Sequence, residues 1–194
     1  MIKVGLICED ISDKTIFSSV NFKEYLFSLN IDIIDDIINA DGCGNLLPHN
    51  IEGYINRLEN KGAEKIIIIR DKDNFPCFTA VKQVINARPK DIVVVPVVEL
   101  ESWFLANTPA MRNLLGIADF IFEHPENERN PFDKINELLV FHTKTKRGIG
   151  KKKSSKLKLA RKLIEIGFKL EESAKHPNCP SAKYFINKLE ELVK

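Results

Sequence analysis

The stretch Lys65-Ile66-Ile67-Ile68-Ile69-Arg70-Asp71-Lys72-Asp73 decides the fold of this chain. Its four consecutive isoleucines predict a strand that is buried on both faces, which is typical of parallel sheets covered by helices. Three further apolar segments, at residues 4–8, 31–38 and 91–98, are predicted as strands as well. Pro96 interrupts the last of them, so we expect the end of that strand to lie at a sheet edge or in a turn.

Helical patterns alternate with these strands. Apolar residues at helical spacing predict helices over residues 12–29, 49–61, 78–87 and 99–107. The alternation predicts an α/β core at residues 1–107, with a Rossmann-like, four-stranded, mainly parallel sheet flanked by helices. We expect the strand order 2-1-3-4, counted along the chain. Residues 108–194 contain helical patterns alone and predict a helical extension packed on the core, with helices at 109–115, 131–140, 155–166 and 181–193.

The composition is that of an ordinary globular protein. The 194 residues are 44% hydrophobic and 29% charged, which fits one domain with an extension. No apolar run approaches the ~20 residues that cross a bilayer, and Glu9 ends the first apolar run too early for a signal peptide. We therefore expect a cytoplasmic protein without a membrane partner. The cysteines form no CxxC pair, which favours reduced thiols over a disulfide framework or a zinc site, at Cys8, Cys43, Cys77 and Cys179.

The net charge of +2 conceals a strongly basic segment at residues 142–169. This segment holds eleven Lys and Arg residues and one acid, a net charge of +10, whereas the rest of the chain carries −8. Such a segment favours a polyanionic partner, and we expect it to bind the phosphate backbone of DNA or RNA without reading sequence. A solvated basic helix without a partner is the alternative. The candidate contacts are Lys151, Lys152, Lys153, Lys158, Arg161 and Lys162.

Acidic residues follow three of the predicted strands. Glu9 comes after the first strand, Asp71 and Asp73 after the third, and Glu99 and Glu101 after the fourth. Ligands of open α/β sheets bind beyond the carboxyl ends of the strands, so we expect the acids after strands one and three to converge there, with both aspartates on the same side. Clustered carboxylates repel one another unless a cation neutralises them, and Mg²⁺ or Mn²⁺ prefers oxygen ligands. Each acid taken alone is more typical of a helix cap that faces water.

At these residues the chain resembles the Toprim domain of topoisomerases, primases and overcoming-lysogenization-defect nucleases. The likeness rests on a strand that ends in Glu9 with Asp13 four positions on, and on a later strand that ends in Asp71 and Asp73. Toprim domains usually have glycine after the first glutamate. Asp10 stands there in this chain, and it either adds a ligand or weakens the analogy.

Two further segments, Val98–Ala106 and Cys179–Ser181, resemble a family of small bacterial Toprim-like proteins. The resemblance implies a metal-dependent nuclease, or a related phosphodiester-processing enzyme, that uses Mg²⁺ or Mn²⁺. It also suggests a role in defence against phage or plasmids, with a protein partner from such a system. The implied metal ligands are Glu9, Asp71, Asp73, Glu99 and Glu101, and the implied catalytic residues are Glu9 (alternatively as general base), Asp71, Asp73 and Glu101.

Two other functions fit the same residues. The first is a non-catalytic nucleic-acid-binding or regulatory protein with a degenerate acidic site, which metal-dependent turnover would distinguish from a nuclease. The second is a receiver-like or phosphatase-like protein with Asp71 as its phospho-acceptor. It fits less well, because strand four leads into Glu99 and Glu101 where a receiver needs a hydroxyl residue, and no fifth strand with a lysine is evident.

Overall fold

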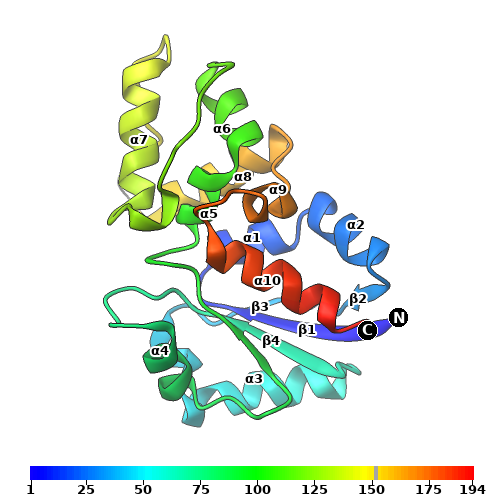
Figure 1. Ribbon diagram of the computed structural model, residues 1–194. Helices are drawn as coiled ribbons and strands as arrows, with labels where there is room; N and C mark the ends of the chain where they lie inside the picture. Colours follow the sequence, from blue (N-terminus) through cyan, green and yellow to red (C-terminus); the bar gives the residue numbers. More distant parts are fainter. Residues whose placement is uncertain (151–152) are drawn as a thin grey trace.

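Five short strands form one parallel sheet in the computed structural model, which describes residues 1–150 and 153–194 (Figure 1). The strand order is β2-β1-β4-β5, β3 also pairs with β1, and all of these pairings are parallel. The α/β class, the parallel sheet and the predicted strand order are thereby confirmed. The strands are β1 Ile2–Cys8, β2 Ile31–Ile33, β3 Ile38–Asn39, β4 Lys65–Ile69 and β5 Ile92–Val94.

Helices cover both faces of this sheet. One face packs against α3 and α4, and the other against α1, α2 and α10 (Figure 1). The helices of the first half are α1 Ile11–Phe17, α2 Val20–Ser28, α3 Pro48–Asn60, α4 Phe78–Ile85 and α5 Glu101–Ala106, with the 3-10 turn η1 Cys43–Leu46. Those of the second half are α6 Thr108–Leu115, α7 Pro131–His142, α8 Lys153–Glu165, α9 Leu170–Ala174 and α10 Pro180–Glu191, with the 3-10 turn η2 Pro125–Asn127. None of the helices in the described residues is long and apolar enough to cross a membrane.

The isoleucines of β4 show why this strand lies at the centre of the sheet. Ile66 and Ile68 pack against the α3 and α4 side, while Ile67 and Ile69 pack against the α1 and α10 side, and all four are buried. Successive side chains of a strand point to opposite faces, so a continuous apolar run is what a strand covered on both faces requires.

The second predicted strand, at residues 31–38, is wrong in its extent. The structure divides it into β2 and β3, so the sheet has five strands where the sequence predicts four. The acidic pair Asp35 and Asp36 explains the break. The Asp36 carboxylate binds Arg57 and Lys61 of α3 at 2.6 and 2.9 Å, and its backbone turns away from β1.

The helix predicted over residues 12–29 is also divided. Ser18 ends the first part as the C-cap of α1, and Ser19 caps the second, because its hydroxyl accepts a hydrogen bond from the Phe22 N–H of α2 at 3.3 Å. A serine in this role satisfies a backbone donor that the helix itself leaves open. The strand predicted over 91–98 is shorter as well, since β5 ends at Val94, two residues before Pro96.

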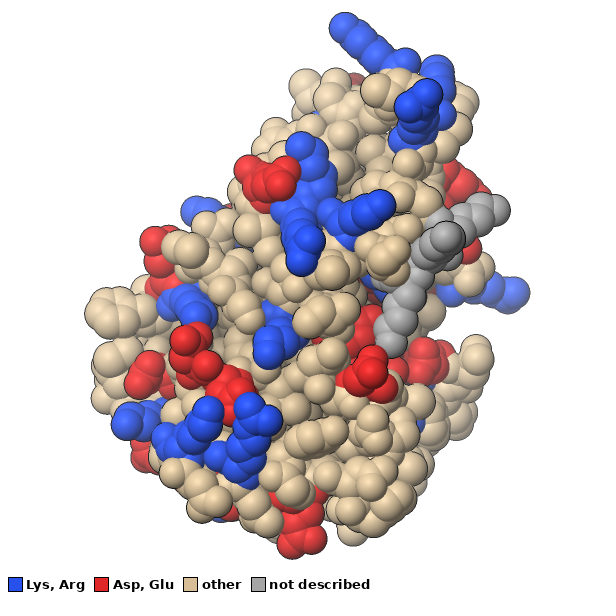
Figure 2. All heavy atoms as spheres, turned by 180° about the vertical axis from the view of Figure 1, so that it is seen from behind, with Lys and Arg blue, Asp and Glu red and all other residues tan. Residues whose placement is uncertain are grey.

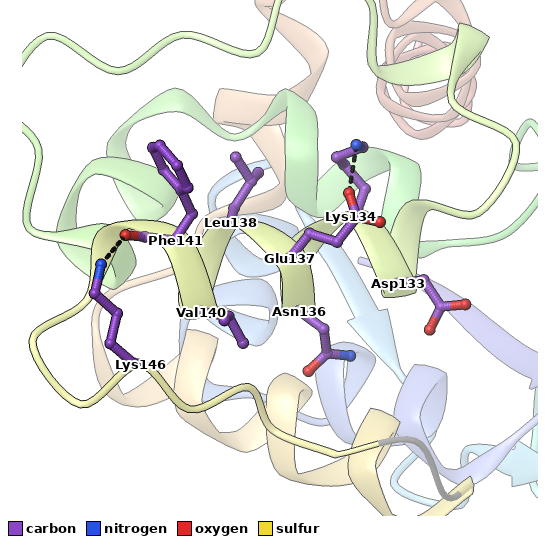
Figure 3. A pocket seen from close by; sticks show the side chains of 8 residues that line it. All are labelled: Asp133, Lys134, Asn136, Glu137, Leu138, Val140, Phe141 and Lys146. Carbon is purple, nitrogen blue, oxygen red and sulfur yellow. Dashed lines mark hydrogen bonds and ion pairs between the residues drawn. The ribbon is translucent and has the colours of Figure 1, made fainter.

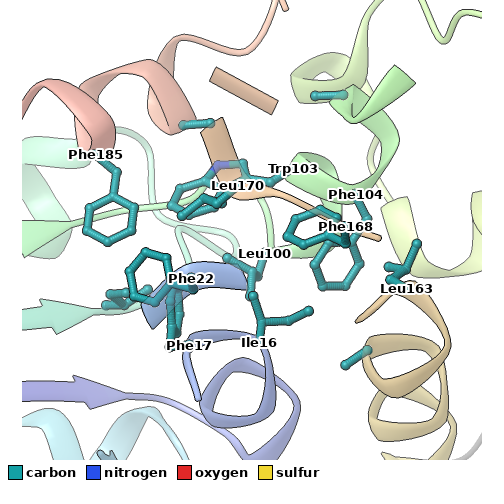
Figure 4. Packing of buried hydrophobic residues seen from close by; sticks show 14 of the residues in the cluster. Ile16, Phe17, Phe22, Leu100, Trp103, Phe104, Leu163, Phe168, Leu170 and Phe185 are labelled. Carbon is teal, nitrogen blue, oxygen red and sulfur yellow. The ribbon is translucent and has the colours of Figure 1, made fainter. Parts of the chain in front are cut away.

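The helical extension shares a hydrophobic core with the sheet domain. Trp103 of α5 is fully buried and stacks on Phe185 of α10, with ring centroids 5.7 Å apart (Figure 4). Phe185 in turn meets the edge of Phe17 of α1 at 5.9 Å. Side chains of α1, α5 and α10 therefore share one core, and α8 meets α5 through the contact between Lys156 and Glu101.

Candidate functional site

The carboxyl ends of β1, β4 and β5 lie side by side and bring three acidic segments to one edge of the sheet. Glu9 follows β1, and Asp71 and Asp73 follow β4. Backbone pairing continues past the ends of β4 and β5, because the Lys72 N–H donates to Pro96 O at 3.0 Å and the Asp73 N–H to Val98 O at 2.8 Å. This pairing places Glu99 and Glu101, the latter at the start of α5, beside the same edge.

The extended conformation ends before Asp73, so the prediction that both aspartates follow a strand's alternation is wrong. Asp73 has a left-handed backbone with φ +48°, and so does Val98 opposite it with φ +63°. A β-branched residue with positive φ is an outlier that the surrounding structure must hold in place. As a result Asp71 is partly buried, whereas Asp73 is exposed and faces the opening of the site.

Asp10 acts as the N-cap of α1. Its carboxylate accepts a hydrogen bond from the Ser12 N–H at 2.6 Å, and the Asp13 carboxylate reaches back to the Asp10 N–H at 3.4 Å. This reciprocal arrangement is a capping box, which satisfies backbone donors at both positions. The box also orients Asp13, which is 4% exposed, beneath the acidic edge.

Burial shifts the titration of the carboxylates at this edge. It raises the pKa of Glu101 to about 7, even though Lys156 acts in the opposite direction. Burial also raises the pKa of Asp71 well above its ordinary value, and the charges of Asp13, Glu101 and Glu9 add to that shift. Burial is also the main cause of the raised pKa of Glu9, and the charge of Asp73 raises it further. The predicted residues therefore act on one another electrostatically.

Lys156 of α8 supplies a positive charge within this acidic edge, although it is not among the residues predicted for the site. Its ammonium lies 2.7 Å from Glu99 Oε2 and 3.1 Å from Glu101 Oε2. Burial disfavours the charged form of Lys156, but the carboxylates of Glu101 and Glu99 outweigh it and raise its pKa. A signal was present in the sequence, because Lys156 shares a helical face with the buried Leu159 and Leu163.

Several polar atoms at the edge have no hydrogen-bond partner. Among the described residues, these include the buried oxygens Glu9 Oε2, Asp71 Oδ1 and Glu101 Oε1. Arg70, which is 4% exposed, leaves its Nε and Nη1 atoms unpaired while its guanidinium lies 5.1 Å from the Phe75 ring centroid. Buried groups of this kind are costly unless a ligand or ion satisfies them.

These oxygens are of the type that a hard divalent cation binds, but their present arrangement does not form a metal site. Carboxylate oxygens are the ligands that Mg²⁺ and Mn²⁺ prefer. Within residues 1–150 and 153–194, however, no three Asp, Glu, His or Cys side chains are grouped so that they could hold a metal ion. Binding an ion therefore requires the side chains to reorient, and Lys156 holds Glu99 and Glu101 in the present arrangement.

The predicted nucleic-acid contacts lie on or before α8. Lys158, Arg161 and Lys162 are exposed, and Lys162 pairs with Glu165 at 3.5 Å. Lys153 begins the helix, while Lys151 and Lys152 fall outside the described residues. Figure 2 shows that Lys and Arg side chains stand in several groups over this face, with Asp and Glu side chains between them.

Two cavities differ in their relation to the acidic edge. The larger, about 770 Å³, runs along α7 and contains none of the predicted site residues (Figure 3). The smaller, about 340 Å³, opens directly at the edge and is lined by Asp73, Glu99 and Lys156, together with Asn74, Val98, Arg129, Asn130, Phe132 and Asp133. The chemistry of its lining makes the smaller cavity the candidate site.

Comparison with protein-family models, curated proteins and solved structures found no match for this chain.

Proposed function

We propose that the protein is a divalent-cation-dependent phosphodiesterase that acts on nucleic acid. The observation that carries this proposal is the set of buried carboxylate oxygens without partners on Glu9, Asp71 and Glu101. Such oxygens repel one another and are stabilised when a cation joins them. The Toprim resemblance of the sequence supports the same chemistry, and a cytoplasmic role in defence against phage or plasmids is part of the proposal.

Each acidic residue has a role in this proposal. Glu9, Asp71 and Asp73 hold Mg²⁺ or Mn²⁺, and Glu99 and Glu101 support a second ion or position the first. A bound divalent ion polarises the phosphate and stabilises the leaving oxygen. Alternatively, Glu9 accepts the proton of the attacking water as the water oxygen bonds to phosphorus and the ester bond breaks. A raised pKa suits Glu9 to this role, because it makes the carboxylate a better proton acceptor.

The exposed face of α8 binds the nucleic-acid backbone in this proposal. Lys158, Arg161 and Lys162 project into solvent on the helix that carries Lys156 into the acidic edge. Contacts from such side chains to phosphate give affinity and orientation without sequence readout. The basic helix would thus hold a polyanion close to carboxylates that would otherwise repel it.

A non-catalytic nucleic-acid-binding protein is the second candidate, and one observation favours it. The Lys156 ammonium already neutralises Glu99 and Glu101, at 2.7 and 3.1 Å, in the way that a cation would. An acidic edge held permanently by a lysine would be a degenerate site. The two candidates differ in whether divalent ions bind and whether turnover follows.

A cleavage panel tests the proposal. Single- and double-stranded DNA and RNA are incubated with Mg²⁺ or Mn²⁺ and the wild type, Asp71→Asn, or Glu52→Gln, which changes an exposed acid on α3. We expect cleavage by the wild type and Glu52→Gln and a loss of more than about a hundredfold in Asp71→Asn, as removal of a charge-stabilising group does in other enzymes. Binding without cleavage by all three proteins would instead establish the second candidate.

A further inference from the structure

We propose that Arg129 binds a phosphate group of the nucleic acid in the cavity at the mouth of the acidic edge. This inference rests on the proposed function and adds a substrate-binding residue to it. Arg129 belongs to the segment between η2 and α7, outside both the predicted acidic residues and the basic segment 142–169. It lines the same cavity of about 340 Å³ as Asp73, Glu99 and Lys156.

The structure fixes the segment that carries Arg129 to the acidic edge. The Phe132 N–H donates to Glu99 Oε1 at 2.8 Å, so one oxygen of Glu99 binds the start of α7 and the other binds Lys156. A second bond spans Arg129 itself, because the Glu128 carboxylate accepts the Asn130 N–H at 3.1 Å. The first bond ties the segment to the acidic edge, and the second fixes the local conformation of the chain around Arg129.

The guanidinium of Arg129 has no partner of its own among the described residues. The side chain is exposed, and it forms neither an ion pair nor a hydrogen bond there, although Glu128 and Asp133 are close in sequence. Two other arginines show the alternative, because Arg57 is engaged by Asp36 and Arg88 by Asp91. Arg129 therefore keeps its donors open toward the cavity that it lines.

The cavity holds both acidic and basic side chains. Asp73 and Glu99 lie on the sheet side, where a cation would bind, whereas Arg129 precedes α7 and shares that side of the cavity with Asp133. A phosphate between these groups would meet the cation on one side and the guanidinium on the other.

An arginine is chemically suited to this position. Its planar guanidinium can donate two parallel hydrogen bonds to the oxygens of one phosphate, which lysine cannot do. A cavity of about 340 Å³ lies at the lower end of the ~300–1,000 Å³ typical of ligand pockets. It has room for one phosphate with its adjoining sugar, and the remainder of the strand would continue over α8.

The test compares Arg129→Gln and Arg129→Lys with the wild type and with Lys183→Gln, a control that removes an exposed positive charge on α10, outside the cavity and the basic segment. Affinity for short single- and double-stranded DNA and RNA is measured at several salt concentrations, with Ca²⁺ replacing Mg²⁺ to limit cleavage. Turnover of bis(4-nitrophenyl) phosphate, a diester too small to extend from the cavity to the exposed face of α8, is measured with Mn²⁺. Stabilisation by Mg²⁺ alone is followed by thermal unfolding.

We expect Arg129→Gln to bind its best nucleic acid about tenfold more weakly, with a log–log salt slope lower by about 0.7–0.9. It should raise KM for the small diester while its stabilisation by Mg²⁺ stays at the wild-type level. Arg129→Lys should fall between the wild type and Arg129→Gln in affinity and KM, and Lys183→Gln should keep the wild-type affinity and KM.

Two other results separate the inference from the proposed function. If the wild type binds nucleic acid and Arg129→Gln matches it in affinity and KM, the phosphate role of Arg129 is overturned while the proposed function stands. If the wild type neither binds any of the four nucleic acids nor gains stability from Mg²⁺, both are overturned. An equal loss in Arg129→Gln and Lys183→Gln would point to a general effect of charge and would also overturn the role of Arg129.

Discussion

Replacing Lys156 with methionine tests the electrostatic account of the acidic edge most directly. The substitution keeps an aliphatic side chain on α8 but removes the charge that lies 2.7 Å from Glu99 and 3.1 Å from Glu101. The side chain of Glu101 is 2% exposed, so water cannot replace the lost ammonium effectively. Removing one partner of a buried ion pair typically costs about 3–5 kcal/mol.

The magnitude depends on pH because Glu101 can take up a proton. Burial already raises its pKa to about 7 with Lys156 present, and the pKa rises further once the lysine is gone. At about pH 8 the wild-type pair is charged, and we expect Lys156→Met to lose roughly 2–3 kcal/mol, or about 5–10 °C in Tm for a chain of this size. At about pH 5.5 Glu101 is protonated in both proteins, and the loss should fall below about 1 kcal/mol.

Urea and thermal unfolding at both pH values, with and without Mg²⁺, measure these differences. Lys158→Met is the matched control, because Lys158 lies two residues away on the exposed face of α8 and should change stability by under about 0.5 kcal/mol. Mg²⁺ should stabilise Lys156→Met more than the wild type, since the ion takes over the neutralising role. A loss that is equal at both pH values, together with no response to Mg²⁺, would refute the reasoning.

Two further predictions concern the acidic edge of the sheet, and a third concerns the exposed face of α8. The metal-free wild type should lose roughly 3 kcal/mol of stability between about pH 4.5 and pH 7, because the folded Glu101 carboxyl keeps a proton that the unfolded carboxyl has released. Urea unfolding across this range measures the loss, and Mg²⁺ should make the dependence of stability on pH weaker. Asp71→Asn should raise or preserve the metal-free Tm, since it relieves repulsion, yet abolish turnover; a large fall in Tm with normal activity would make Asp71 structural. The triple change of Lys158, Arg161 and Lys162 to glutamine should weaken all nucleic acids about equally and lower the log–log salt slope by about 0.7–0.9 per lost contact; coincident slopes would exclude α8 as the binding surface.

Much of the core could be predicted from the sequence because its signals are local. The isoleucines 66–69 identify a central strand without reference to any other part of the chain. The alternation of strands and helices then leaves few arrangements, and the observed order β2-β1-β4-β5 is the one predicted. The division of the strand at residues 31–38 was not predicted, because it depends on the ion pairs of Asp36 with Arg57 and Lys61, which are distant in sequence.

The acidic residues of the candidate site could be predicted from the sequence, whereas its basic residues could not. Glu9 and Asp71 follow strands, so topology alone brings them to one edge. Lys156 and Arg129 reach the same place from the helical extension, and their positions depend on how α7 and α8 pack over α5. The helical spacing of Lys156 to Leu159 and Leu163 indicates that this lysine faces inward, but the spacing does not show which carboxylates it meets.

The stacking of Trp103 on Phe185 gives the protein a built-in optical probe. Trp103 is the sole tryptophan of the chain, and its indole N–H donates to Ser181 Oγ at 2.7 Å. Its fluorescence therefore arises from the seam between α5 and α10 and from nowhere else. Release of α10 would expose the indole to water and shift its emission to the red even while the helices stay intact, so undocking of the extension can be followed separately from the melting of secondary structure.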